Sequence, residues 1–381
     1  MKTILQKILF VSLSSICFAF FSPSSTLGAT ITSNGSGNWN AGATWAGGIA
    51  PVATDDVVIR PGDVITVTAN ATANSLTFAS TAATNGTVTV NIGIVLTITA
   101  NVIFQNSATL NTAATLTGAG TINVGGSVTI GNTSVPTASH TATVTWSAAI
   151  LNVTGGITLT SQRSGITNNN PTLQIASGVV SVGGTLSCVT ASNAASTTLV
   201  TLQTGAQSGT LNLAGSPAIT TSANLGVSTF SFNGTTSTVN YDGTLAQTVR
   251  NTTYRTLKIN NSIGATLIGA TTVTTLTIGD VTASSIFNDG GFQVTSVGTL
   301  NLTSGTFNLG SAVSATTWPA FATRNITGGT IVAYVSGVAQ NISTTPNYQE
   351  LTVSGAGVKT AAGAINVLQN LTNSSILDMT G

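Results

Sequence analysis

Short segments in which apolar and hydroxyl-bearing residues alternate recur along this chain. The clearest lie at residues 64–68, 87–92, 95–99, 127–130 and 156–160. Val, Ile and Thr favour β-strands, and a period of two gives each strand one apolar and one polar face. Turns rich in Gly, Asn and Ser separate the segments. The pattern predicts an all-β fold.

A shorter repeat in the middle of the chain places glycine after an apolar-polar-apolar triplet. Its four copies contain Gly125, Gly155, Gly183 and Gly215, at a near-constant interval. An interval of about 30 residues fits one coil of a parallel β-helix, in which inward side chains of successive coils form ladders of Val, Ile and Leu. A β-sandwich array would not explain this regular glycine interval. The sequence therefore predicts a right-handed parallel β-helix, or β-solenoid.

A longer repeat occupies the C-terminal part. Tyr241 recurs as Tyr334 and Tyr254 recurs as Tyr348, at almost the same shift and with the surrounding pattern repeated. Self-similarity of this kind is typical of stacked repeat architectures. We expect Tyr254 and Tyr348 to have the same structural role at a corner of the coil in each copy.

The segment 1–29 has the layout of a secretory signal peptide. Lys2 and Lys7 precede a run of mostly apolar residues at 8–21, and the small residues Gly28 and Ala29 follow. The run is too short for a permanent bilayer anchor. The mature chain is therefore predicted to have no membrane span and to be secreted or held at the outer cell surface.

The chain divides into four predicted parts. They are a signal peptide at 1–29, an N-terminal capping segment at 30–70, a solenoid at 71–235 and two long solenoid repeats at 236–381. In the solenoid at 71–235, each coil is predicted to be as long as the interval between the repeated glycines. The second long repeat stops where the first continues, so it is predicted to be truncated. An uncapped solenoid end exposes strand edges, and we expect the sequence to be the N-terminal fragment of a longer protein.

Charge is scarce. Charged residues make up 4% of the chain, against about 25% in typical globular domains, and the formal net charge is +1. The hydrophobic fraction of 41% is too high for a disordered chain. No basic excess is available for nucleic acid or anionic lipid, so nucleic acid is excluded as a predicted partner.

Candidate catalytic and metal-binding residues are few. His140 is the only histidine and lies in a segment that reads as an exposed loop, and Cys188, the only cysteine beyond the leader, is predicted to be buried and inert. Asp55, Asp56 and Asp63 form the only acidic cluster, which could be a calcium site or a carboxylate pair. We prefer to interpret these acids as turn-forming, solvated residues of the capping segment. We expect no catalytic site, no metal and no cofactor.

Trp39 and Trp45 have two interpretations. Their rings could stack on sugars, or they could plug the open end of the first coil and shield the core from water. The second interpretation is preferred, so both tryptophans are predicted to be structural residues.

Several stretches together resemble large secreted β-solenoid surface proteins of Bacteroidota-type bacteria. They are Gly37-Asn38-Trp39, residues 44–51, 55–59 and 62–67, and a repeat pattern from Gly337 to Thr360. The resemblance implies a β-solenoid fold and a cell-surface or adhesin-like role. Many members of the family end in a sorting domain for type IX secretion, and no such domain is found in this sequence.

Three function classes follow. The first is a non-enzymatic structural or adhesin-like surface protein that makes multivalent, low-charge contacts with surface polysaccharide or with other cells. The second is a β-helix polysaccharide-active enzyme or carbohydrate-binding module. The third is an ice- or crystal-binding protein that uses Thr-x-Thr ladders at Thr66/Thr68, Thr87/Thr89 and Thr97/Thr99.

Overall fold

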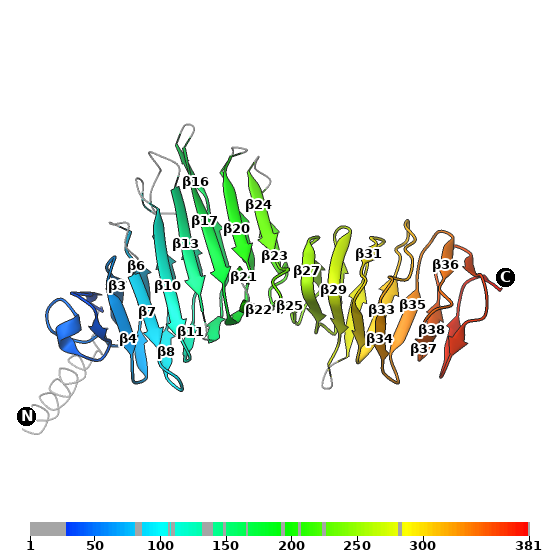
Figure 1. Ribbon diagram of the computed structural model, residues 1–381, viewed down its shortest axis with the longest axis horizontal. Helices are drawn as coiled ribbons and strands as arrows, with labels where there is room; N and C mark the ends of the chain where they lie inside the picture. The colour runs from blue at the N-terminus through cyan, green and yellow to red at the C-terminus, as the bar shows by residue number, and fades with distance from the viewer. Residues whose placement is uncertain are drawn as a thin grey trace, which may run out of the picture.

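The computed structural model describes residues 28–379 except for 81–85, 106, 108–110, 132–139, 148–149, 165–166, 192–194, 205–206, 223–225 and 281–283. The predicted signal peptide at 1–29 lies almost entirely outside these residues. Figure 1 shows an elongated rod in which strands stand side by side and the chain runs from one end to the other. Within the described ranges the only helix is the 3-10 turn η1 (Gly42–Thr44). The predicted all-β class is confirmed.

Two sheets occupy the N-terminal half. Sheet 1 contains, in spatial order, β1 (Thr30–Thr32), β3 (Asp56–Ile59), β6 (Ser75–Phe78), β9 (Val102–Phe104), β12 (Val128–Ile130), β15 (Ile157–Thr160), β19 (Leu186–Val189) and β23 (Ile219–Thr221). Sheet 2 contains β2 (Gly37–Asn38), β4 (Val64–Val67), β7 (Gly86–Val90), β10 (Thr112–Gly118), β13 (His140–Trp146), β17 (Thr167–Ile175), β20 (Thr197–Thr201) and β24 (Val227–Ser231), with β16 (Gln162–Ser164) antiparallel to β17.

Sheet 3 extends through most of the rod. It contains β5 (Ala71–Ala73), β8 (Val95–Ile98), β11 (Thr121–Val124), β14 (Ile150–Val153), β18 (Gly178–Val182), β22 (Gln207–Leu213), β25 (Thr238–Tyr241), β27 (Thr253–Ile259), β29 (Thr271–Ile278), β32 (Thr299–Leu302) and β34 (Thr323–Ile326), with β21 (Gln203–Thr204) beside β22 and β31 (Val294–Thr295) beside β29.

Three further sheets lie in the C-terminal half. Sheet 4 contains β26 (Gln247–Val249), β28 (Ala265–Leu267), β30 (Ser285–Asn288), β33 (Gly305–Leu309), β35 (Ile331–Tyr334), β38 (Glu350–Val353) and β41 (Leu371–Asn373). Sheet 5 contains β36 (Gln340–Ile342), β39 (Lys359–Ala361) and β42 (Leu377–Asp378), and sheet 6 contains β37 (Asn347–Tyr348) and β40 (Asn366–Val367).

The path of the chain is that of a parallel β-solenoid. From β3 to β25 the chain visits sheets 1, 2 and 3 in turn, so that each strand pairs in parallel with its equivalent one coil away. The antiparallel strands β16 and β21 are local additions to this path. The long parallel sheets agree with the stacked-coil prediction, whereas a sandwich would need antiparallel pairs.

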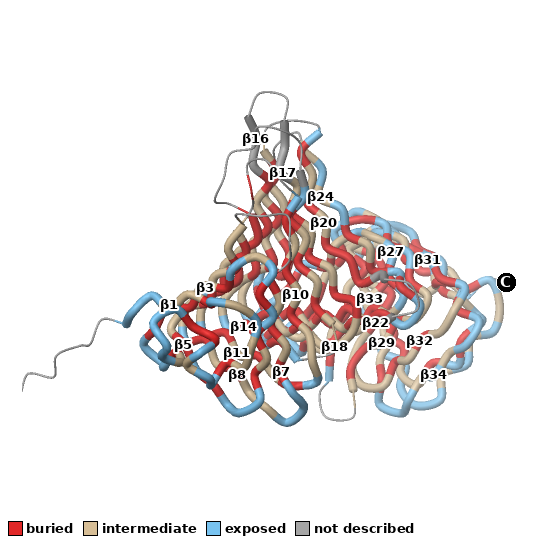
Figure 2. Tube along the Cα trace, turned by 60° about the vertical axis from the view of Figure 1, so that its left-hand side comes forward, coloured by how far each residue is buried: buried red, intermediate tan, exposed pale blue. Residues whose placement is uncertain are grey.

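The alternation in the sequence fixes which side chains form the core. One inward column of sheet 1 contains, coil after coil, Val57, Leu76, Val102, Val128, Ile157, Leu186 and Ile219. All of them are buried, and one continuous apolar cluster extends from Trp39 to Ala361. Buried and half-buried residues alternate along the strands in Figure 2. Because the strand period is two, a register slip by a single position would expose an entire column.

The glycines of the short repeat form a corner between sheets 3 and 1 where successive coils come very close. The Gly155 amide donates to the Gly126 carbonyl at 2.9 Å, and the Gly184 amide donates to the Gly155 carbonyl at 2.9 Å. A Cβ added at Gly183 would lie 2.5 Å from the Thr154 carbonyl oxygen. The glycine is required there by close backbone approach.

The other three predicted glycines are equally confined. An added Cβ would lie 2.5 Å from the Thr99 carbonyl oxygen at Gly125, 2.5 Å from Ser127 Oγ at Gly155 and 2.2 Å from the Gly184 carbonyl oxygen at Gly215. None of the four has a positive φ. Lack of space, rather than a special backbone angle, is therefore the reason for glycine at these positions.

Coil length changes along the rod. Ile122 pairs with Leu151, and Leu151 pairs with Val180. The number of residues in each of these coils is therefore close to the interval between the repeated glycines. Thr238 pairs with Thr256, so this coil contains clearly fewer residues. The C-terminal coils thus begin with fewer residues per turn than those of the middle region.

The two long repeats do not lie on the same face. Tyr241 belongs to β25 in sheet 3, whereas its counterpart Tyr334 belongs to β35 in sheet 4. The next strands shift in the same way, since β26 lies in sheet 4 and its counterpart β36 lies in sheet 5. The stretch of chain from Tyr241 to Tyr334 therefore makes a whole number of coils and then continues to the next face of the rod.

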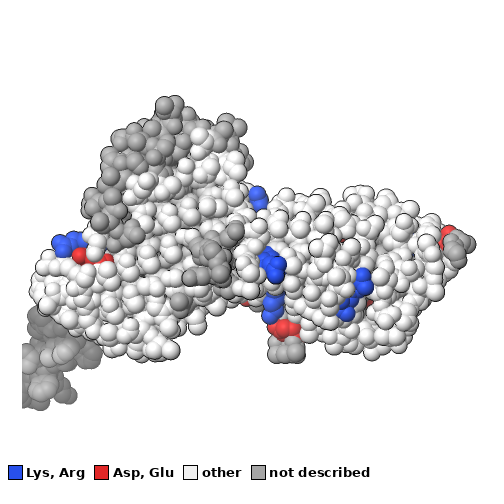
Figure 3. Space-filling model, in the orientation of Figure 1, with Lys and Arg blue, Asp and Glu red and all other residues white. Residues whose placement is uncertain are grey.

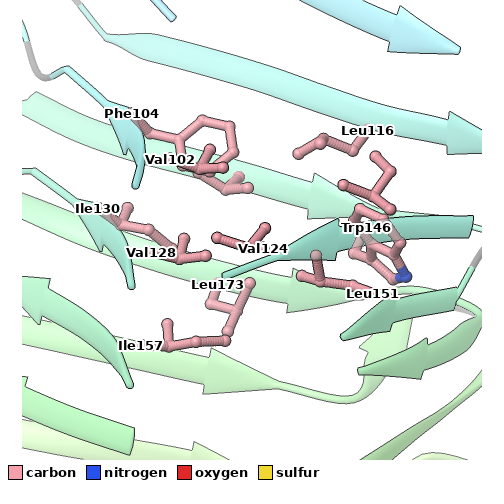
Figure 4. A pocket seen from close by; sticks show the side chains of 12 residues that line it. Val102, Phe104, Leu116, Val124, Val128, Ile130, Trp146, Leu151, Ile157 and Leu173 are labelled. Atoms are coloured by element: carbon pink, nitrogen blue, oxygen red, sulfur yellow. The ribbon is translucent and has the colours of Figure 1, made fainter. Parts of the chain in front are cut away.

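A small void of about 20 Å³ lies in the core near β9 to β15 (Figure 4). Apolar side chains from all three sheets line it, among them Phe104, Val124, Val144 and Leu173. Its walls offer no hydrogen-bond partner to water or to a polar ligand. The void is a packing defect and carries no site.

The glycine corner generates a stability prediction. Gly183→Ala should lower the free energy of unfolding by about 2 to 3 kcal/mol, because the added methyl group must displace backbone. Gly328→Ala is the matched control, since an added Cβ there meets nothing closer than 3.5 Å. Urea denaturation measures both, and equal midpoints for the two variants would show that the corner is not tightly packed.

Candidate interaction surface

The two tryptophans close the N-terminal end of the core. Trp39 and Trp45 are each 1% exposed, and their rings meet edge to face with centroids 5.2 Å apart. Trp45 Nε1 donates to the Trp39 carbonyl at 2.7 Å. Both rings belong to the continuous apolar cluster. This placement agrees with the plug interpretation and leaves neither ring face free to stack on a sugar.

The acidic cluster holds the same end together. Asp55 accepts hydrogen bonds from the amides of Ala29 and Val52, both at 2.9 Å. Asp63 accepts from Ser33 Oγ at 2.5 Å and from the Gly35 amide at 3.3 Å.

Asp55 and Asp63 are 7% and 8% exposed, so the expectation that these acids are solvated is wrong. Carboxylates that accept several hydrogen bonds can be buried. Asp56 likewise accepts from Asn74 Nδ2 at 2.9 Å and from Ser75 Oγ at 2.6 Å. The three acids tie segments together and are not arranged as a catalytic pair.

The remaining candidate nucleophile and base belong to strands of different sheets, Cys188 to β19 in sheet 1 and His140 to β13 in sheet 2. Cys188 continues an inward column after Leu159 and is 1% exposed, and burial raises the pKa of its thiol to about 12. His140 begins β13 and is therefore not in a loop as expected, although its side chain lies outside the described residues. A thiol with so high a pKa is not a nucleophile at neutral pH.

The repeated tyrosines form matching hydrogen-bonded pairs. The hydroxyls of Tyr241 and Tyr254 lie 3.1 Å apart, and the Tyr254 hydroxyl donates to the Arg250 carbonyl at 2.7 Å. In the second copy the Tyr334 and Tyr348 hydroxyls lie 2.9 Å apart, and Tyr348 donates to a carbonyl at 2.7 Å. All four rings are 0% exposed. Each pair links two neighbouring stretches of backbone at an internal corner.

A buried glutamine accompanies each tyrosine pair. Gln247 Nε2 donates to the carbonyls of Leu213 and Gly215, at 2.7 and 2.9 Å. Gln340 Nε2 donates to the carbonyls of Leu309 and Thr316, both at 3.0 Å. Both glutamines satisfy carbonyl groups where the coil turns. Their roles were not predicted from the sequence, although their recurrence in the long repeat was the signal.

A column of polar side chains runs along the outer side of sheet 3. Its members, one per coil, are Thr72, Thr97, Asn123, Asn152, Ser181, Asn212, Asn240, Lys258, Thr277, Asn301 and Asn325. All except Asn240 are at least partly exposed. We call this set the outer column.

Amide groups connect the outer column from coil to coil. Asn152 Nδ2 donates to Asn123 Oδ1 at 3.0 Å, and Asn325 Nδ2 donates to Asn301 Oδ1 at 2.8 Å. Lys258 carries the column's one charge and contacts Asp280 at 3.5 Å. Because an amide both donates and accepts, an asparagine of the column can bond a neighbour and still offer a group to a ligand.

Charged residues make up only 4% of the chain. Figure 3 shows one face of the rod on which acidic and basic atoms form only small isolated groups. An open hollow of about 190 Å³ lies against the column, lined by Asn152, Ser181, Asn212 and Asp242 among others. Apart from the carboxyl group of Asp242, the polar side chains named here offer neutral hydrogen-bonding groups. Asn123, Asn152 and Asn212 occupy the polar position of the short repeat, so the sequence contained this signal beside the glycines.

The three Thr-x-Thr pairs do not share one plane. Thr66 and Thr89 are neighbours on sheet 2, whereas Thr97 lies in β8 on sheet 3. A flat crystal-binding face needs its hydroxyl groups in a single array. These threonines are divided between two faces.

Across the described residues no group of three or more His, Cys, Asp or Glu side chains is placed to hold a metal ion. The same part of the chain contains no helix with the length and apolar character to span a bilayer. The sequence matches no protein-family model, and comparisons with curated proteins and with solved structures find no significant similarity.

The tyrosine pairs generate a pH prediction. Burial raises the pKa of Tyr334 to about 12 and raises the pKa of Tyr241, Tyr254 and Tyr348 as well. Because these folded pKa values exceed the unfolded value of about 10, the stability they contribute is present below pH 10 and is lost as the pH rises from about 10 toward 12. Phenolate absorbance should therefore appear only together with unfolding.

These four are all the tyrosines of the chain, so the absorbance reports on nothing else. The unfolded protein in denaturant is the control and should titrate near pH 10. Phenolate formation near pH 10 in protein that still gives a folded circular dichroism spectrum would contradict the buried placement.

The tryptophan plug generates a further stability prediction. Replacing both Trp39 and Trp45 with alanine should cost about 3 to 5 kcal/mol for each ring, because the end of the core becomes open to water. Ile49→Ala is a control in the same segment, since Ile49 is 67% exposed. Thermal melting checks the pair, and an unchanged melting temperature in the double variant would refute the plug.

Proposed function

We propose that this protein is a non-enzymatic, adhesin-like structural protein of the cell exterior. In this proposal a signal peptide at 1–29 directs the chain out of the cell, and a right-handed β-helix presents its side to surface polysaccharide or to other cells. The resemblance to secreted Bacteroidota-type solenoid proteins supports the same role.

The observation that carries the proposal is the outer column. It places a neutral hydroxyl or amide group on every coil from Thr72 to Asn325 except the coil that carries Lys258. A polysaccharide also repeats hydroxyl groups along its length. Individually weak contacts in such an array add up, because each contact raises the effective concentration of the next.

The scarcity of suitable catalytic groups favours binding over turnover. Asp55 and Asp63 are engaged in hydrogen bonds at the N-terminal end, and Cys188 is buried with a raised thiol pKa. A polysaccharide-active enzyme would need an acid and a base facing one groove. The carbohydrate-binding alternative would use the same outer column, and the enzyme alternative is tested below.

A triple variant with Asn123→Ala, Asn152→Ala and Asn212→Ala tests the proposal. Binding to immobilised neutral polysaccharide should weaken by at least about tenfold, because three contacts of the array are lost. The matched control replaces Thr129, Thr158 and Ser187, three half-exposed neighbours in an outward column of sheet 1, with alanine. Equal binding by the two triple variants would contradict a role for the outer column.

Salt and turnover provide independent checks. Binding should change little between low and high salt, because few charges are available to screen. A variant with Asp55, Asp56, Asp63 and His140 all replaced by alanine should be assayed for polysaccharide cleavage beside the wild type. Cleavage by the wild type that disappears in a variant still shown to be folded would favour the enzyme alternative.

A further inference from the structure

Arg324 occupies a position that belongs to the core. The inward column of sheet 3 that ends at this residue contains Val239, Leu257, Leu276 and Leu300 on the four preceding coils, all 0% exposed. The next member in register is Arg324, which is half-buried on β34. Its outward neighbour Asn325 continues the outer column, which confirms that Arg324 belongs to the inward set.

The regular stacking ends immediately after this arginine. Among the described strands β34 pairs only with β32, and the following coil instead forms the separate pair β37 and β40. A crevice of about 330 Å³ lies at this break, lined by Arg324, Ile326, Thr345, Asn347, Gln349 and Leu368 among others. Its volume is at the lower end of the range for small-molecule sites, about 300 to 1,000 Å³.

The arginine has no partner within the described structure. The ion pairs there join Arg60 to Asp63 and Lys258 to Asp280, and neither involves Arg324. Arg324 Nε is buried and lacks a hydrogen-bond acceptor. A buried guanidinium N–H without an acceptor leaves the charge of Arg324 poorly solvated, and an anion bound in the crevice would stabilise that charge.

The other polar groups of the crevice are able to donate as well. Asn347 Oδ1 accepts from Asn366 Nδ2 at 3.0 Å, which leaves its own Nδ2 as a donor. Thr345 Oγ1 accepts from Ser343 Oγ at 3.2 Å, which leaves its hydroxyl proton to donate. Gln349 Nε2 donates across the crevice to the Ile326 carbonyl at 3.4 Å and helps fix its width.

Apolar groups complete the lining. Ile326 is half-buried and Leu368 is 54% exposed, so each offers aliphatic surface to the crevice. The combination of one unpaired guanidinium, several donors and two aliphatic side chains suits a ligand with an anionic end and a ring with apolar C–H groups. Arginine binds carboxylates in a planar, two-bonded geometry.

We propose that the crevice at β34 binds the carboxylate of an acidic sugar, such as a uronic acid residue, with Arg324 as the carboxylate-binding residue. The carboxylate accepts hydrogen bonds from the guanidinium. Thr345 and Asn347 donate to other oxygens of the sugar, and Ile326 and Leu368 contact the sugar ring. The sugar scaffold rests on the proposed function, whereas the anion preference rests on the crevice alone.

Calorimetric titration of the full chain tests the site. Sodium glucuronate should bind, neutral glucose should bind at least about tenfold more weakly, and Arg324→Gln should weaken glucuronate binding at least about tenfold, since charge-assisted hydrogen bonds are the strong ones. Arg255→Gln is the matched control, because Arg255 is exposed and remote from β34 in register. It should leave binding unchanged.

Arg324→Leu separates binding from folding. Leucine continues the aliphatic column, so this variant should melt at or above the wild-type temperature and still lose glucuronate binding. Absence of glucuronate binding by the wild type, or equal binding by wild type and both Arg324 variants, would overturn the proposal. Acetate or inorganic phosphate binding as tightly as glucuronate would overturn the sugar assignment.

The two proposals fail differently. The triple variant of the outer column should weaken binding to neutral polymer without changing glucuronate affinity. Changes at Arg324 should affect glucuronate alone.

Discussion

The in-register stacking of one coil on the next determines the rest of this structure. Parallel strands in a sheet lie about 4.8 Å apart, so every position on a coil faces the same position on the next. An inward residue must fit a column, as Val57 and Leu76 do. At the corner that runs from Gly125 to Gly215 the backbones approach so closely that no side chain fits. Hydrogen bonds between coils and burial of the columns then arise from the same arrangement.

Stacking also explains why charge is scarce. A charged residue repeated at one position would lie beside its own copies, and like charges directly opposite each other destabilise a sheet. Amides avoid this problem because neighbours such as Asn123 and Asn152 bond to each other. The column's one cation, Lys258, has Asp280 beside it. Arg324 stands where the stack is interrupted, which is where an unpaired charge has room for a ligand in place of a next-coil neighbour.

The elements that repeat at short range could be predicted from the sequence. Period-two alternation identified the strands, and the near-constant glycine interval identified the coil, because both patterns follow directly from stacking. The role of Asp55 and Asp63 was not predictable, since it depends on contacts with the Ala29 and Gly35 amides, which lie far from them in the sequence. The Arg324 crevice was also hidden, because only three-dimensional register shows that this arginine follows Leu300 in a core column.

The long repeat shows which features stacking preserves. Its two copies lie on different sheets, yet the hydroxyl contacts of 3.1 and 2.9 Å within the tyrosine pairs are nearly the same. The outward positions differ, since Asn240 of the first copy corresponds to Ala333 of the second and Lys258 corresponds to Thr352. A repeated ligand site would require the outward residues to match. The long repeat therefore reproduces an internal corner, and any multivalency must come from the outer column, which recurs coil by coil.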